Sequence, residues 1–142
     1  MKIKTLTLEN FMIFDSIDVE WSPNINVILG ENSTGKTTLL KAMYSLVKPY
    51  GRSDFLKCTQ MQQEDMIVGK MVGVFRPDEK KIGRMSSRRR GAPKNTKMKV
   101  CTAEGDIIEV SFGSRRENHA DVSVRHSEKS KLCDPVYLPT KE

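Results

Sequence analysis

Hydrophobic and polar residues alternate in several short segments of the chain, a pattern typical of strands with one buried face. It is imperfect in "KIKTLTLENF" (residues 2–11) and clearer in "SIDVEW" (residues 16–21), where Ile17, Val19 and Trp21 share one face. Further along, it predicts an antiparallel β segment over residues 97–126, with strands at 97–102, 106–112 and 120–125. The "AEGD" between the first two of these strands is a turn signal.

A different pattern follows the first two strands. "INVIL" (residues 25–29) is a continuous apolar run, as expected of a strand that is covered on both faces. From Lys36 onward, apolar residues recur at helical spacing, and Pro49 and Gly51 should end this helix. The apolar positions of the predicted helix are Leu39, Leu40, Met43, Leu46 and Val47.

Two further elements are predicted with less regular patterns. Residues 62–75 read as a second amphipathic helix, although Gly69 and Gly73 lower the helix propensity of this segment. "PVYLP" (residues 135–139) reads as a short apolar strand between two prolines.

The loop between the buried-type strand and the first helix carries a phosphate-binding motif. "GENSTGKT", Gly30 to Thr37, matches G-x-x-x-x-G-K-[ST]. Glycines let backbone N–H groups approach a phosphate closely, the lysine reaches the terminal phosphates, and the threonine hydroxyl is the expected Mg²⁺ ligand. The alternative is a glycine-bearing turn without a ligand, but the strand and helix on either side favour ATP and Mg²⁺ binding. The predicted nucleotide-binding residues are Gly30, Asn32, Ser33, Thr34, Gly35, Lys36, Thr37 and Thr38, with Thr37 as the metal ligand.

The whole opening, "IKTLTLENFMIFDSIDVEWSPNINVILGENSTGKTTLLKAMYSL", resembles the ABC-type P-loop ATPases of the RecF, structural-maintenance-of-chromosomes (SMC) and OLD-nuclease kind. Glu9-Asn10-Phe11, Phe14 and the "PNIN" turn fall in register with that pattern. The ending "DPVYLPTKE" also resembles a segment that leads toward the Q-loop in bacterial AAA-family ATPases of this group. The resemblance implies an α/β P-loop fold with an antiparallel β layer, incomplete at the C-terminus.

The departures from this family shape the expected activity. Members often carry an arginine just after "NF", where this chain has Met12 and Ile13. An apolar run ending in Asp-Glu, the Walker B motif, and the signature motif are absent from the sequence, so the parts needed to activate water are missing. Residues 1–142 are therefore expected to be the N-terminal ATP-binding lobe of a larger ATPase. Hydrolysis is expected only when the other lobe completes the site, and Glu142 falls near the family's Q-loop position.

The resemblance further implies an ATP-dependent dimer in DNA repair or maintenance, or in anti-phage defence, where such ATPases act with a nuclease or with DNA. Other interpretations stay open: a complete small nucleotide-binding protein, a non-catalytic nucleotide sensor and a nucleic-acid-binding module. A transporter ATPase is a further alternative, although the "LENF" opening suits the DNA-processing branch better.

The net charge of +6 supports the nucleic-acid-binding alternative because it is local. Residues 76–99 contain ten Lys and Arg against two Asp and Glu, and they read as a basic loop. Such a cluster is often only a solvated surface, but it could contact nucleic-acid phosphates without reading sequence. The lack of interleaved aromatic residues argues against single-strand recognition. The candidate residues are Arg84, Arg88, Arg89, Arg90 and Lys94, together with Lys97 and Lys99.

The remaining composition favours a cytoplasmic protein without a membrane span. The three cysteines form no C-x-x-C pair, which argues against a disulfide or zinc framework and for a reducing compartment. The sequence has no run of eighteen apolar residues. His119 and His126 are not spaced with other ligands as a metal site requires.

Overall fold

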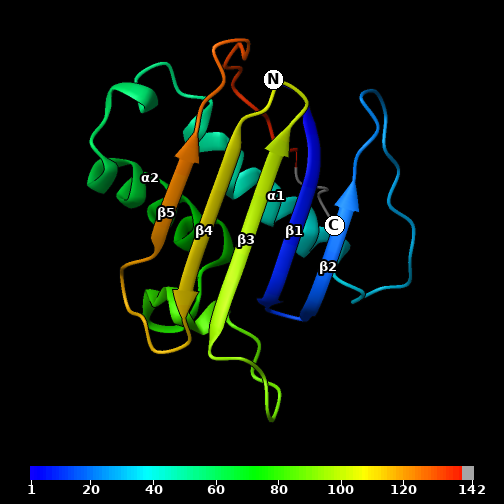
Figure 1. Cartoon of the computed structure of the whole chain (residues 1–142). Coiled ribbons are helices and arrows are strands. Elements are labelled where there is room, and N and C mark those ends of the chain that lie inside the picture. Colours follow the sequence, from blue (N-terminus) through cyan, green and yellow to red (C-terminus); the bar gives the residue numbers. More distant parts are fainter. Residues whose placement is uncertain (139–142) are drawn as a thin grey trace.

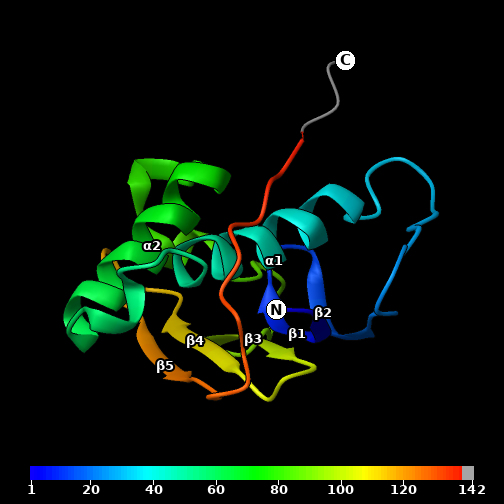
Figure 2. The same ribbon diagram turned by 90° about the horizontal axis from the view of Figure 1, so that it is seen from above.

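The computed structural model describes residues 1–138 as a five-stranded sheet with two helices on one of its faces (Figures 1 and 2). All neighbouring strands are antiparallel, in the order β2-β1-β3-β4-β5. The predicted α/β class with an antiparallel β layer is confirmed. The strands are β1 (Ile3–Phe11), β2 (Phe14–Glu20), β3 (Asn95–Thr102), β4 (Ile107–Gly113) and β5 (Asp121–Arg125), and the helices are α1 (Lys36–Tyr50) and α2 (Gln60–Phe75).

The core lies between the sheet and the two helices, and the strand alternation determines which residues enter it. On β1, Leu6 and Leu8 pair with Val100 and Met98 of β3, and all four side chains are fully buried. Ile108 continues the same apolar face onto β4, opposite Val100. Burial of one face while the other meets solvent is the usual arrangement for an antiparallel sheet.

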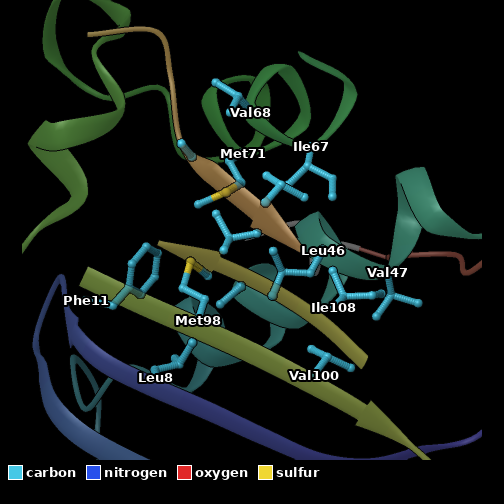
Figure 3. Close-up of a cluster of buried hydrophobic side chains, with 14 of the residues drawn as sticks. Leu8, Phe11, Leu46, Val47, Ile67, Val68, Met71, Met98, Val100 and Ile108 are labelled. Atoms are coloured by element: carbon cyan, nitrogen blue, oxygen red, sulfur yellow. The ribbon is translucent and has the colours of Figure 1, made fainter. Parts of the chain in front are cut away.

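The helices cover this face with their apolar stripes, as Figure 3 shows for Leu46 and Val47 of α1 and for Ile67 and Met71 of α2. Both helices form close to where the sequence predicts them. Helix α2 begins with a capping box, in which the Thr59 side chain accepts from the N–H of residue 62 and the Gln62 side chain accepts from the N–H of residue 59. This reciprocal pair explains why the helix starts at Gln60 despite its two glycines.

The prediction of a buried strand at residues 25–29 is wrong for the described chain. Ile25, Val27 and Leu29 are 86%, 75% and 86% exposed, and the segment has no strand hydrogen bonds. A strand covered on both faces needs neighbours in a parallel or mixed sheet. Within residues 1–138, every strand belongs to the antiparallel sheet, and none pairs with this segment.

The prediction of a strand at residues 135–139 is also wrong over residues 135–138, and residue 139 lies outside the described residues, as does Glu142. This part of the chain lies along α1 instead, where the rings of Tyr137 and Tyr44 are 5.5 Å apart. Pro135 cannot donate a ladder hydrogen bond, which disfavours pairing with the sheet.

The basic segment is not one open loop. It contains two short 3₁₀ turns, Asp78–Lys80 and Ile82–Met85, and the side chains of Ile82 and Met85 are buried in the core. From Asn95 onward it is already part of β3. Over residues 1–138, no helix is long and apolar enough to cross a membrane.

Candidate functional site

The G-x-x-x-x-G-K-[ST] loop connects the edge strand β2 to α1, and a turn at its start fixes where it leaves the sheet. The Trp21 N–H donates to the carbonyl of Lys4 on β1 at 2.8 Å. The Asn26 amide then closes the turn, because its Oδ1 accepts from the Ser22 N–H at 2.8 Å and its Nδ2 donates to the Ser22 carbonyl at 2.9 Å. This is the "PNIN" turn of the sequence. The loop beyond it projects past the start of α1 (Figures 1 and 2).

The backbone of the loop turns sharply before α1. Ser33 has a φ of 64° and Gly35 a φ of 90°, so two residues adopt left-handed conformations just before α1. The Thr34 hydroxyl donates to the carbonyl of Glu31 at 2.9 Å. The Lys36 ammonium reaches back across the loop, donating to the carbonyl of Gly30 at 2.7 Å and to that of Glu31.

Gly35 is the point where this loop touches the sheet. A Cβ at this position would lie 2.4 Å from Ile13 Cδ1 and 2.7 Å from Phe14 Cζ, so a larger residue would displace these side chains and would also be strained at a φ of 90°. Ile13 belongs to the turn between β1 and β2, and Phe14 is the first residue of β2. The sequence pattern did not assign these two residues to the loop, because their contact joins segments that are more than twenty residues apart.

The start of α1 suits an anion. Gly35 occupies the N-cap position, no side-chain hydrogen bond caps the helix there, and the first turn contains no acidic residue. The free N–H groups and the positive end of the helix dipole therefore face the loop. Lys36 is half-buried beside them, and Thr37 is exposed at the first turn. This donor set fits a triphosphate, and a threonine hydroxyl next to it fits Mg²⁺.

The structure places the other predicted nucleotide-binding residues on the same loop. Asn32, Ser33 and Thr34 are exposed, and Thr38 is half-buried in the first turn of α1. The geometry thus keeps the predicted set together, and nucleotide binding by these residues stays a prediction.

The predicted basic cluster is divided by the structure. Arg84, Arg88, Arg89 and Lys94 line one cavity of about 340 Å³. Lys97 and Lys99 lie instead on β3, where they point to the solvent face because Thr96, Met98 and Val100 take the buried positions. Arg90 is exposed beside the cavity and does not line it.

Arg115 and Arg116 are basic residues that the sequence analysis missed. They line a second cavity of about 240 Å³ together with Arg84 and Lys81. Hydrogen bonds from Lys81 to Glu79 and Glu117 raise the pKa of the Lys81 ammonium above its ordinary value, and the same contact with Lys81 lowers the pKa of Glu79. The only signal in the sequence was an arginine pair just after Gly113.

The two histidines do not form a metal site. The His119 Nδ1 lies 3.3 Å from Glu64 Oε1, and the His126 Nδ1 lies 2.6 Å from the Tyr50 hydroxyl and 3.3 Å from Asp106 Oδ1. Among residues 1–138, no three His, Cys, Asp or Glu side chains are grouped as a metal would require. The three cysteines are free thiols.

A P-loop between a sheet and the exposed start of a helix defines the class of this molecule as a P-loop NTPase-like α/β domain. The profile of the AAA ATPase domain family matches residues 1–133, and the chain belongs to this family.

Individual relatives agree with this assignment. The DNA replication and repair protein RecF is 46% identical over 46 residues in Staphylococcus haemolyticus and 50% identical over 46 residues in Halalkalibacterium halodurans. Each match covers 32% of this chain and only 12% of the RecF protein.

A solved structure shares the fold over most of the chain. It is described as "Structural biochemistry of ATP-driven dimerization and DNA stimulated activation of SMC ATPases". It matches with a TM-score of 0.56 and 12% identity, covering 89% of this chain and 71% of the other. The predicted resemblance to RecF- and SMC-type ATPases is confirmed.

Proposed function

We propose that the chain binds the triphosphate of Mg·ATP through residues 30–38. The observation that carries this proposal is the uncapped start of α1 directly behind a loop with two left-handed residues and Lys36. Lys36 contacts the β- and γ-phosphates, the N–H groups of the loop cradle them, and Thr37 ligates Mg²⁺. When bound, Mg²⁺ supplies charge neutralisation of the phosphates.

The chain acts as the first lobe of an ATPase in DNA repair or maintenance. The family membership and the likeness to RecF support this setting. The carboxylate that orients water comes from another lobe or another subunit, because the sequence offers no apolar run followed by Asp-Glu. Dimerisation on ATP is part of the same proposal, and the description of the solved structure with a similar fold, which speaks of ATP-driven dimerization, supports it. A role in anti-phage defence, a nuclease partner and a cytoplasmic location stay predictions.

Equilibrium binding of a fluorescent ATP analogue with Mg²⁺ tests the proposal. We expect Lys36→Ala to lose binding by at least about tenfold, because the loss of one charge-assisted contact costs about 1.5–3 kcal/mol. Lys41→Ala is the matched control, since it removes the same charge further along α1. Phosphate release from the 142-residue chain should equal that of Lys36→Ala.

Three results separate the alternatives. Equal loss in both lysine variants would show that general charge attracts the analogue and would overturn the proposed site. Phosphate release well above the Lys36→Ala background would contradict the need for another lobe. Tight binding that never leads to release, even when the remaining ATPase parts are supplied, would favour a nucleotide sensor.

A further inference from the structure

Two adjoining basic cavities lie at the end of the sheet where β3 begins and β4 ends. The larger, of about 340 Å³, is lined by Arg84, Arg88, Arg89 and Lys94, with the hydroxyl-bearing Ser86, Ser87 and Ser114. The smaller, of about 240 Å³, is lined by Lys81, Arg84, Arg115 and Arg116. Arg84 and Ser114 line both, so the two cavities form one surface, here called the basic cleft. In Figure 1 the connections before β3 and after β4 lie together at the lower end of the sheet.

Backbone contacts join the two sides of the basic cleft. The Ile82 N–H donates to the carbonyl of Glu117 at 2.9 Å, and the Gly83 N–H donates to that of Arg116 at 3.0 Å. A Cβ at Gly83 would lie 2.5 Å from the backbone oxygen of Ser114, so glycine is required for this close approach. The backbone that carries Arg115 and Arg116 is therefore held beside the segment of Arg84 by the fold, and the three residues line one cavity.

Asn10 anchors the other wall. It has a φ of 54° and is 1% exposed, and its Nδ2 donates to the carbonyls of Pro93 at 2.6 Å and Asn95 at 3.1 Å. Its own carbonyl accepts from the Ser87 N–H at 3.0 Å. The segment that bears the arginines is thus tied to the end of β1, which gives the Asn-Phe pair of the sequence a structural role.

Carboxylates neutralise part of the basic cleft but leave cations unpaired. Arg88 pairs with Asp78, and Arg89 pairs with Asp15. Lys81 pairs with both Glu79 and Glu117, and Arg84 also pairs with Glu79. Within residues 1–138, no carboxylate lies within 4 Å of the charged groups of Lys94, Arg115 and Arg116. These three groups and the exposed Ser114 hydroxyl remain available as donors to an anionic ligand, whereas the Ser86 hydroxyl is buried against Thr96 Oγ1 at 2.7 Å.

We propose that the basic cleft binds the phosphodiester backbone of duplex nucleic acid. Guanidinium groups and serine hydroxyls are the side chains that contact phosphate oxygens without reading base sequence. Among the described residues that line the two cavities, none is aromatic, so there is no platform on which single-stranded bases would stack. An acidic peptide is less favoured, because the apolar side chains available to it are only Ala92 and Pro93.

The site is separate from the nucleotide loop. No residue of 30–38 lines either cavity, so the proposal stands whether or not the loop binds ATP. The two features share one neighbour, the turn between β1 and β2 with the start of β2. Ile13 and Phe14 contact Gly35, and Asp15 pairs with Arg89.

The test is binding of a short fluorescent duplex DNA to the full chain across a range of salt concentrations. We expect the double variant R115A/R116A to weaken binding by about tenfold or more and to reduce the salt slope by about 0.9 for each lost phosphate contact. Both side chains are exposed, so the fold should survive, which circular dichroism checks. Arg115→Lys with Arg116→Lys keeps the charge and should lose only part of the affinity.

R125A/K129A is the matched control, because it removes two exposed cations at the opposite end of β5. It should stay within about twofold of the wild type, since only long-range charge is lost. An equal loss in both double variants, or no binding of duplex DNA at low salt, would overturn the site. Polyglutamate is the probe for an acidic protein. If it binds as tightly as DNA and depends equally on Arg115 and Arg116, the basic cleft is a site for an acidic protein and the proposal is overturned.

Two further arms separate the sources of phosphate and the two proposals. Inorganic phosphate should compete with the duplex only at concentrations far above those of DNA phosphate, because the DNA backbone engages both cavities at once. Competition at equal concentration would show that the site binds only a free anion and would overturn the proposal.

Lys36→Ala should keep duplex binding unchanged. A loss in that variant would place the DNA contact on the P-loop and overturn the basic cleft.

Discussion

Gly35 meets two structural demands at once. Its φ of 90° lies in the left-handed region, and its missing side chain leaves room for Ile13 and Phe14. In a phosphate-binding motif the glycine is usually explained by the ligand's need for close backbone approach. Here the protein's own side chains at the start of β2 also restrict the position.

We expect Gly35→Ala to lower the free energy of unfolding by about 2–5 kcal/mol, from backbone strain and overpacking, and to weaken ATP-analogue binding. Gly69→Ala is the control, since a Cβ there has nothing within 4 Å and α2 should gain about 0.5–1 kcal/mol. Denaturant unfolding measures both changes. A Gly35→Ala chain as stable as the wild type would show that the loop yields at this contact.

At the scale of elements, the hairpin between β3 and β4 depends on one buried carboxylate. Asp106 is 0% exposed, and its Oδ2 accepts from the Thr102 hydroxyl at 2.9 Å. Its Oδ1 accepts from the Ser127 N–H at 2.7 Å, which ties the chain after β5 to the same turn. Burial alone raises the pKa of Asp106, but these hydrogen bonds outweigh burial and hold the pKa below its ordinary value.

The pKa of Asp106 is lower in the folded state than in the unfolded state, so its ionised form contributes to the free energy of unfolding. This contribution is fully present above the unfolded pKa and is lost as the pH falls through the folded pKa. Wild-type stability should therefore fall below about pH 4, near the unfolded pKa of an aspartate. Asp106→Asn should be less stable near pH 7 and lose less on acidification. Denaturant unfolding of both chains at about pH 7 and about pH 3 measures this, and parallel losses in the two would contradict the assignment.

At the scale of the whole molecule, apolar side chains are divided between one core and exposed segments, of which residues 25–29 are an example. Leu46 is fully buried between α1 and the sheet, whereas Val27 and Leu29 are 75% and 86% exposed. The hydrophobic contribution to folding follows the apolar area removed from water, so the two sets should differ sharply in their effect on stability.

We expect Leu46→Ala to lower the free energy of unfolding by about 2–5 kcal/mol. Val27→Thr and Leu29→Ser should change it by less than about 0.5 kcal/mol, because these side chains contact little else. Thermal or denaturant unfolding compares them directly. Losses at Val27 or Leu29 as large as at Leu46 would mean that the 25–29 segment is buried in solution.

Local patterns predicted much of the fold. The alternation around Leu6, Met98 and Val110 depends only on the period of a strand, and the apolar spacing from Leu39 to Val47 depends only on the period of a helix. The sequence also predicted the position of the P-loop just before the first helix, because its glycines, lysine and threonine lie within eight consecutive residues. These features follow from interactions over a few residues, so the sequence alone determined them.

Only the tertiary structure decided features that join distant segments. An apolar run such as residues 25–29 is compatible with a buried strand, but strand pairing depends on neighbours that no local pattern supplies. The division of the basic residues has the same cause. Lys97 leaves the cluster because of its register on β3, whereas Arg116 enters it through a backbone hydrogen bond to Gly83, thirty-three residues earlier in the chain.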